Sequence, residues 1–69
     1  MGYYHMVIAR YGRCMDFHTE QELREELRRY FTNSELRSGI VDRLLTFGKP
    51  NEYGYAQNNW RDVTVTRFF

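Results

Sequence analysis

The sequence predicts a two-layer α+β domain in which a three-stranded sheet carries two helices on one face, in the order ββααβ. Three patterns predict this fold class. The first part of the chain alternates apolar and polar residues, the middle part repeats apolar residues at helical spacing, and residues 60–69 alternate again. No stretch rich in Pro, Ser or Gly divides the 69 residues, so we interpret residues 1–69 as a single domain.

An N-terminal hairpin is predicted from two β-prone segments, residues 3–10 and 14–18, which meet across a two-residue turn at Tyr11 and Gly12. Gly12 supplies the positive φ that such a turn needs. The resulting register gathers the apolar side chains of both strands on one face, as a half-buried sheet requires: Met6, Ile8, Met15 and Phe17. We therefore expect this face to pack on the core.

Two successive helices are predicted from a repeated start signal. Thr19 with Glu22 has the spacing of a capping box, in which the hydroxyl and the carboxylate satisfy free backbone N–H groups. Thr32 with Glu35 repeats this spacing, so the first helix should end near Thr32, where the second begins. Apolar residues follow each signal at helical intervals: Leu23, Leu27, Tyr30 and Phe31 in the first helix, and Leu36, Ile40, Leu44 and Leu45 in the second.

The second helix is expected to end at about Phe47, because Gly48 can adopt the left-handed cap and Pro50 prevents continuation. Gly39 lies inside this predicted helix and should weaken it by about 1 kcal/mol relative to Ala. The sequence thus predicts one helix from Thr32 to Phe47.

The chain is expected to end in a long loop followed by a strand. Residues 51–59 are polar and have no convincing period, whereas residues 60–69 place Val63 and Val65 on one face and polar residues on the other. We expect this last strand to lie beside the first and parallel to it, because the two-helix crossover is long enough for such a return. Pairing with the second strand is the alternative.

Composition favours a binding protein over an enzyme. The formal net charge is +1, and the 10 basic residues are nine Arg and a single Lys. Arg forms bidentate contacts and stacks on aromatic rings, which makes it frequent at interfaces, although biased codon usage explains the same count equally well. The 6 Tyr, 5 Phe and 1 Trp exceed what so small a core encloses, so some of these rings must lie on the surface. Motifs for catalysis or nucleotide binding are lacking, and we predict no catalytic residue, cofactor or metal.

Cellular location is predicted from what the sequence lacks. No apolar run approaches the roughly 20 residues that cross a bilayer, and the N-terminus lacks the order of a signal peptide. Cys14 is the single cysteine, which excludes an intramolecular disulfide and a cysteine-cluster zinc site. We expect a soluble cytoplasmic protein that does not bind membranes.

Candidate contact residues are concentrated in the predicted loop and at its boundary. Tyr53, Tyr55 and Trp60 have the amphipathic aromatic character of interface hot spots. With neighbouring and helical arginines they form the partner-binding set that we predict: Tyr53, Tyr55, Trp60, Arg61, Arg24 and Arg28. Burial is the better interpretation for Trp60 alone, whereas for the two tyrosines binding and sealing of the sheet edge are equally supported. The expected partner is another protein or protein complex.

Three other interpretations are open. Arg and Tyr side chains could bind RNA or single-stranded DNA, although interleaved Glu residues weaken the field that attracts phosphates. His5, which faces His18 in the predicted register, and Asp16 could hold a divalent metal. Aromatic residues at both ends of the chain could close the core or form a homodimer contact: Tyr3, Tyr4, Phe68 and Phe69. A catalytic Cys14 is discounted, because His18 lies about 13 Å away along the same strand.

In size, in its lack of catalytic motifs, and in its order of hairpin, helices and final strand, the chain resembles the small phage-encoded inhibitors, including anti-CRISPR proteins. The resemblance covers the whole chain. It implies a compact scaffold that occupies a site on a host protein or complex, and it assigns no functional residue.

Overall fold

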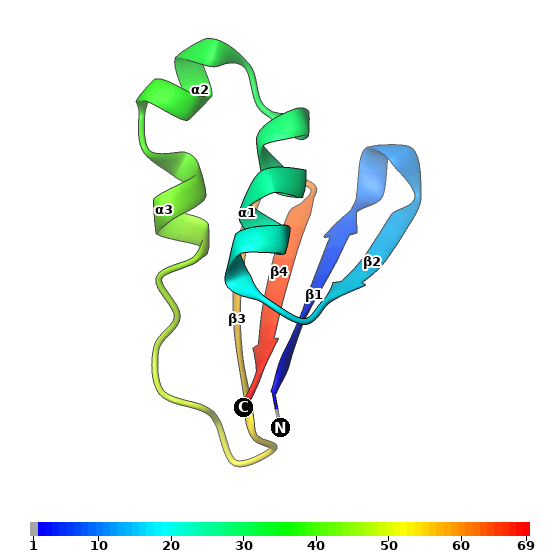
Figure 1. The fold of residues 1–69 in the computed structure, drawn as a ribbon, viewed down its shortest axis with the longest axis vertical. Helices are drawn as coiled ribbons and strands as arrows, with labels where there is room; N and C mark the ends of the chain where they lie inside the picture. The colour runs from blue at the N-terminus through cyan, green and yellow to red at the C-terminus, as the bar shows by residue number, and fades with distance from the viewer. Residues whose placement is uncertain (1) are drawn as a thin grey trace.

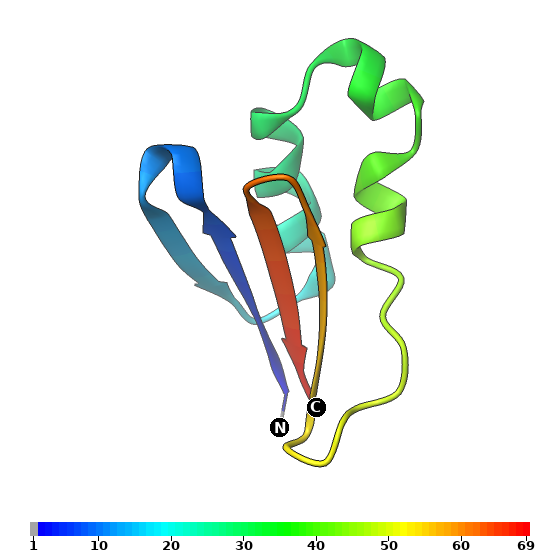
Figure 2. The ribbon, with the colours of Figure 1, turned by 180° about the vertical axis from the view of Figure 1, so that it is seen from behind.

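The fold is an α+β domain built on one four-stranded sheet. The computed structural model describes residues 2–69. In chain order its strands and helices are β1 (Tyr3–Ile8), β2 (Arg13–Phe17), α1 (Glu20–Leu27), α2 (Asn33–Arg37), α3 (Ile40–Leu44), β3 (Tyr55–Trp60) and β4 (Val63–Phe68). The sheet order is β2-β1-β4-β3, every neighbouring pair is antiparallel, and the helices lie on one face (Figure 1 and Figure 2).

The prediction of a three-stranded sheet is wrong, because residues 55–59 of the predicted loop belong to a fourth strand, β3. This strand pairs with β4 along its whole length, and Arg61 and Asp62 form the two-residue loop between them. The extra strand reverses the chain once more. As a result β4 lies beside β1, as expected, but antiparallel to it and not parallel.

The strand β3 lacks the alternation of apolar and polar residues that predicts a strand, because one of its inward-facing residues is an asparagine, Asn58. Asn58 Nδ2 donates hydrogen bonds to the carbonyl oxygens of Leu44, at 2.8 Å, and Thr46, at 3.1 Å. These oxygens lie at the C-terminal end of α3, where helical carbonyls lack partners within the helix. Asn58 thus connects the edge strand β3 to the helical layer by hydrogen bonds. The spacing of apolar residues in the sequence cannot predict this role.

The first hairpin has the predicted faces but a different register. Its turn spans residues 9–12, as a 3₁₀ turn followed by Gly12 at φ 58°, and not the predicted two-residue turn. The register is therefore displaced, and His5 lies opposite Asp16 instead of His18. Because the displacement is an even number of residues, each side chain keeps its predicted face, and the apolar pattern could not detect the difference.

Both predicted helix starts are confirmed. Thr19 Oγ1 accepts a hydrogen bond from Glu22 N at 3.2 Å, at the start of α1. Thr32 and Glu35 form the complete reciprocal capping box, with Thr32 N donating to Glu35 Oε1 at 2.8 Å. This hydrogen bond from the Thr32 backbone holds the pKa of Glu35 below the 4.5 of an ordinary glutamate.

The single helix predicted from Thr32 to Phe47 is wrong, because Gly39 divides it. Gly39 has a φ of 83°, in the left-handed region, and separates α2 from α3. It is a helix break and not a weak point inside a helix. The cap predicted at Gly48 is also wrong, since α3 ends at Leu44 and Gly48 is not among the glycines with positive φ.

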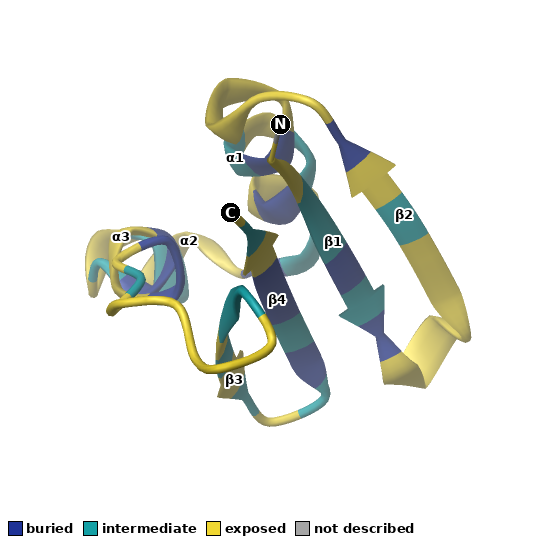
Figure 3. Ribbon diagram, turned by 90° about the horizontal axis from the view of Figure 1, so that it is seen from below, coloured by how far each residue is buried: buried dark blue, intermediate teal, exposed yellow. Residues whose placement is uncertain are grey.

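The core lies between the inward face of the sheet and the helices. Along β1 and β4, buried positions are interspersed with more exposed ones, as expected for a sheet that is covered on one face only (Figure 3). The buried apolar side chains come mainly from β1, β4, α1 and α3: Met6, Ile8, Phe17, Leu23, Leu27, Phe31, Ile40, Val41, Leu44, Leu45, Val63 and Val65.

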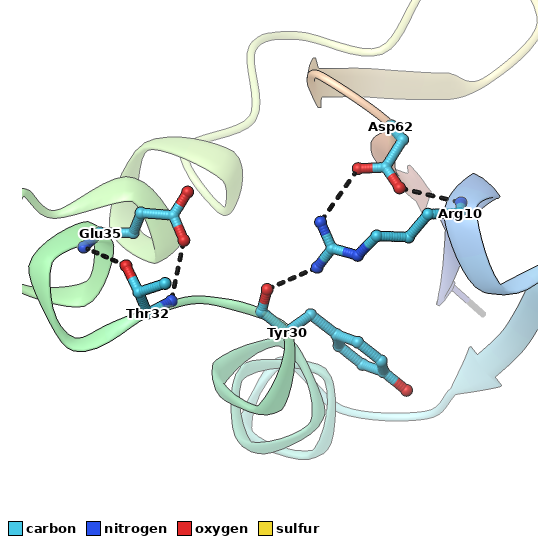
Figure 4. A network of polar contacts seen from close by, with 5 residues as sticks. All are labelled: Arg10, Tyr30, Thr32, Glu35 and Asp62. Atoms are coloured by element: carbon cyan, nitrogen blue, oxygen red, sulfur yellow. Dashed lines mark hydrogen bonds and ion pairs between the residues drawn. The ribbon is translucent and has the colours of Figure 1, made fainter.

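Polar contacts join three separate chain segments at one end of the sheet (Figure 4). Asp62, in the β3–β4 loop, accepts a hydrogen bond from Arg10 N at 2.9 Å and another from the Arg10 guanidinium at 3.4 Å. The same guanidinium donates to the carbonyl oxygen of Tyr30 at 2.6 Å, at the end of the 3₁₀ turn that follows α1. Arg10 therefore links the β1–β2 loop, the β3–β4 loop and the helical layer.

Replacing Gly39 with Ala should lower the free energy of unfolding by about 1–2 kcal/mol, because a residue with a Cβ is strained in the left-handed region. Apart from the two neighbours in the chain, no described residue has an atom within 4 Å of the added Cβ, so the loss would reflect backbone strain and not a clash. Gly48→Ala is the matched control, since its Cβ also meets open space but its φ is not positive. Urea unfolding of the three proteins measures the difference. Replacement of a glycine inside a helix by alanine usually stabilises a protein. If Gly39→Ala were stabilising, the helix break at Gly39 would be contradicted.

Asp62→Ala should cost about 1–2 kcal/mol, because it removes the two carboxylate oxygens that accept hydrogen bonds from Arg10, and the Asp62 side chain is only 25% exposed. Asp42→Ala is the control. It also removes an aspartate paired with an arginine, Arg24, but that aspartate is 75% exposed, so the cost should be about 0–1 kcal/mol. Thermal unfolding of both variants tests this. Equal losses would show that the Arg10 contacts stabilise no more than an ordinary surface ion pair.

Candidate interaction surface

One face of the sheet carries no helix (Figure 3). Because side chains alternate along a strand, the residues between the core positions point away from the helices. We call this surface the open face, and the pairing register lines up its residues in rows across the strands: Tyr3, His5 and Val7 of β1, Cys14 and Asp16 of β2, Tyr55, Gln57 and Asn59 of β3, and Thr64, Thr66 and Phe68 of β4.

Aromatic rings cross one end of the open face. Tyr3 and Tyr55 both lie opposite Phe68 in the sheet. The ring centroids of Tyr3 and Phe68 are 4.6 Å apart and their planes differ by 17°, while the centroids of Phe68 and Tyr55 are 5.7 Å apart. Tyr53 extends the line beyond the sheet, with its ring stacked on that of Tyr55 at 6.5 Å. We call Tyr3, Phe68, Tyr55 and Tyr53 the aromatic row.

A tight turn before β3 fixes the position of Tyr53. Asn51 Oδ1 accepts hydrogen bonds from the backbone N–H groups of Tyr53, at 2.9 Å, and Tyr55, at 3.2 Å. Gly54 closes the turn with a φ of 86°, and its N–H donates to Asn51 O at 3.0 Å. Asn and Gly suit these two positions, because Asn bonds its own backbone and Gly accepts a positive φ. The turn thus presents the Tyr53 side chain, which is 77% exposed, on a fixed backbone.

The other two rows of the open face are mostly polar. Gln57 Nε2 donates to Thr66 Oγ1 at 2.9 Å, and Thr66 is buried although it belongs to the open face. On the other side of β1, His5 Nδ1 lies 2.5 Å from Asp16 Oδ1, and His5 Nε2 lies 3.2 Å from Cys14 Sγ. These polar groups therefore have partners within the face itself.

The geometry does not support the metal site considered for His5, His18 and Asp16. His18 lies beyond the end of β2, and the observed register does not place it opposite His5. Within residues 2–69, no three His, Cys, Asp or Glu side chains are arranged to hold a metal ion. Sequence reasoning missed the contact of His5 with Cys14, because the predicted register put His18 opposite His5.

Trp60 and Arg61 lie away from the aromatic row, at the other end of β3. The Trp60 ring packs against the core, and its centroid is 5.9 Å from that of Phe31. Arg61, with a φ of 55°, places its guanidinium over the Trp60 ring at 4.4 Å. Because alternation puts Tyr55 and Trp60 on opposite faces of the sheet, the predicted contact set does not form one continuous surface.

Arg24 belongs to α1 and Arg28 directly follows this helix, on the covered side of the sheet. Arg24 Nη1 lies 2.5 Å from Asp42 Oδ1 and Nη2 lies 3.5 Å from Glu20 Oε1, so this side chain connects α1 with α3. The hydrogen bond to Asp42 raises the pKa of Arg24 above its usual value. Arg28 is exposed at the C-terminal end of α1. Both arginines are thus separated from the open face by the sheet.

Sequence reasoning does not select Tyr3 and Phe68 as contact residues, and assigns them to core closure or a dimer contact. A signal for Phe68 is nevertheless present. Val63 and Val65 mark the inward face of the last strand, so Phe68, three residues after Val65, falls on the opposite face. Tyr3 could be found only from the register, which pairs it with Phe68.

Comparisons with known proteins add no family to this geometry. No protein-family model, curated protein or solved structure matches the chain. In the described part of the chain, no helix combines the length and the apolar character needed to span a bilayer. A function therefore has to be argued from the surfaces of the fold.

Within the aromatic row, Phe68→Ala should destabilise the fold and Tyr53→Ala should not. Phe68 contacts the rings of Tyr3 and Tyr55, so its loss should cost about 1–3 kcal/mol. Tyr53 is 77% exposed, and its replacement should change the free energy of unfolding by less than about 0.5 kcal/mol. Urea unfolding followed by circular dichroism measures both. A large loss for Tyr53→Ala would show that this ring supports the fold and is not free for binding.

Proposed function

We propose that this chain is a non-enzymatic protein-binding module that acts as an inhibitor or adaptor on another protein or protein complex. The aromatic row is its proposed contact surface. One observation carries the proposal: four aromatic rings, those of Tyr3, Phe68, Tyr55 and Tyr53, contact one another outside the core, on a face that no helix covers.

The row suits a protein partner because its rings are already ordered. Tyr combines a large apolar ring with a hydroxyl group, and it loses little rotamer freedom when it is fixed at an interface. The Asn51 turn and the stacking on Tyr55 hold Tyr53 before any partner binds. Preorganised contacts bind more tightly, since less conformational entropy is lost on association.

RNA or single-stranded DNA is the weaker alternative for this surface. None of the side chains of the open face is Arg or Lys, so the face has no strong donor for phosphate contacts. The faces of the Tyr3 and Phe68 rings lie against each other, 17° from parallel, so a base could stack between them only if they separated.

The proposal agrees with the resemblance to small phage-encoded inhibitors, which occupy a site on a host protein, and it places the action in the cytoplasm. That resemblance now depends on size and on the lack of catalytic motifs, since the strand order differs from the expected one. Self-association is the competing form of protein binding, because the aromatic row of a second copy could pack against the first.

Capture experiments with three immobilised proteins test the surface: the wild type, Tyr53→Ala and Tyr11→Ala. Tyr11 is the matched control, because it is also an exposed tyrosine, at 65% against 77%, but lies in the β1–β2 loop. Lysate of the cells in which the protein occurs is applied with and without nuclease, and bound proteins are quantified by mass spectrometry. We expect a partner retained by the wild type and by Tyr11→Ala but captured at least about tenfold less by Tyr53→Ala.

Three outcomes separate the alternatives. Equal capture by all three proteins would overturn the aromatic row as the contact surface. Loss of every partner after nuclease treatment would favour the nucleic-acid alternative. Light scattering of the purified protein tests self-association, and a dimer that Tyr53→Ala dissociates while Tyr11→Ala does not would show that the row binds a second copy.

A further inference from the structure

Cys14, His5 and Asp16 form a continuous chain of contacts on the open face. His5 Nε2 lies 3.2 Å from Cys14 Sγ, and His5 Nδ1 lies 2.5 Å from Asp16 Oδ1. The register explains this placement, because Asp16 is directly opposite His5 and Cys14 is one diagonal step away, opposite Val7. The imidazole of β1 thus lies between a thiol and a carboxylate that both come from β2.

This order of groups activates a thiol. When the Asp16 carboxylate accepts a hydrogen bond from Nδ1–H of His5, the lone pair of Nε2 faces the Cys14 thiol. Nε2 can then accept the thiol proton, and Asp16 stabilises the imidazolium that results. The thiolate form of cysteine is the nucleophile, so a base within hydrogen-bond distance, itself oriented by a third group, makes the sulfur reactive.

Two other roles fit the same residues less well. Metal binding requires ligand atoms that converge on one point, whereas here each ring nitrogen of His5 faces a different side chain. Enzymatic acyl transfer requires a pocket beside the thiol. The cavities of about 300 and 270 Å³ are lined by other residues, the first between α3 and β3 and the second around the chain ends. Cys14 is exposed and open to small reagents.

We propose that Cys14 is a modification site, a reactive thiol that forms a mixed disulfide with low-mass disulfides, with His5 as its base and Asp16 as a positioning residue. His5 Nε2 takes the proton of the Cys14 thiol, and the thiolate attacks one sulfur of the disulfide R–S–S–R. The new S–S bond forms as the old one breaks, and the leaving R–S⁻ takes the proton from His5. One thiol and one disulfide are consumed, and one mixed disulfide and one thiol are formed.

The adduct would have no route of release within these residues. Cys14 is the single cysteine of the 69 residues, so no second thiol among them can displace the adduct. Its release requires an external thiol, which makes the modification reversible and dependent on the redox state of the surroundings. If the open face binds a protein partner, as in the proposed function, an adduct on Cys14 would obstruct that partner. Only this consequence rests on the proposed function, and the reactivity of Cys14 does not.

The reaction rate with dipyridyl disulfide at pH 6 tests the proposal without any partner. At this pH an ordinary thiol is almost wholly protonated, so the effect of a neighbouring base is large. We expect the folded protein to react about tenfold faster than the same chain unfolded in urea, measured by the absorbance of the released pyridinethione. His5→Asn should remove this gain. His18→Asn is the matched control and should retain it, because His18 lies beyond the end of β2.

Asp16→Asn tests the positioning role separately. It should also lower the rate, and it should reduce the population of the Nδ1–H tautomer of His5 in ¹⁵N NMR spectra, which a merely structural residue would not change. Circular dichroism establishes that each variant is folded. A folded protein that reacts no faster than the unfolded chain would overturn the proposal, and so would equal effects of His5→Asn and His18→Asn. If His5→Asn does not fold, the comparison of the folded wild type with the unfolded wild type still tests the proposal.

Discussion

The contacts between Arg10 and Asp62 hold the two hairpins to each other. In a chain of 69 residues the apolar core is small, so polar contacts at its margin carry a large share of the specificity. Asp62 accepts hydrogen bonds from the backbone and the guanidinium of Arg10, and Ala9 N donates to Asp62 O at 2.9 Å. These bonds fix the pairing of β1 with β4 from one end. The same pairing of β1 with β4 places Tyr3 opposite Phe68 at the other end of the two strands.

Sequence patterns predict the faces and starts of elements better than the pairing between them. Thr19 and Thr32 begin helices because their capping bonds are local. The strand β3 cannot be predicted from alternation, since inward-facing Asn58 finds its partners at the end of α3 only once the fold has formed. Gly39 shows the same limit. A glycine within an apolar helical pattern fits a weak helix and a helix break equally, and only the φ of 83° in the structure identifies the break.

Residues of the candidate surface that stand out by composition could be predicted from the sequence. Contacts that depend on how the strands pair could not. Tyr53 and Tyr55 stand out because two tyrosines in a polar segment are unusual, and both belong to the aromatic row. Trp60 stands out for the same reason but lies on the other face, because residues 55–60 form a strand and not a loop. The contact of His5 with Cys14 needed the correct register: an even displacement leaves all faces unchanged while it replaces every cross-strand neighbour.

The open face brings the proposed contact surface close to the proposed reactive thiol. Cys14 lies opposite Val7, which is four residues along β1 from Tyr3, so the thiol is roughly 13 Å from the aromatic row. An extended tripeptide spans about 10 Å, so a tripeptide thiol joined to Cys14 would cover the polar row of His5 and Thr66, which lies between Cys14 and the aromatic row. Cys14 and its neighbours on this face are not part of the core. An adduct could therefore change partner binding without unfolding the protein, because it would be attached outside the core and would remove no buried apolar side chain.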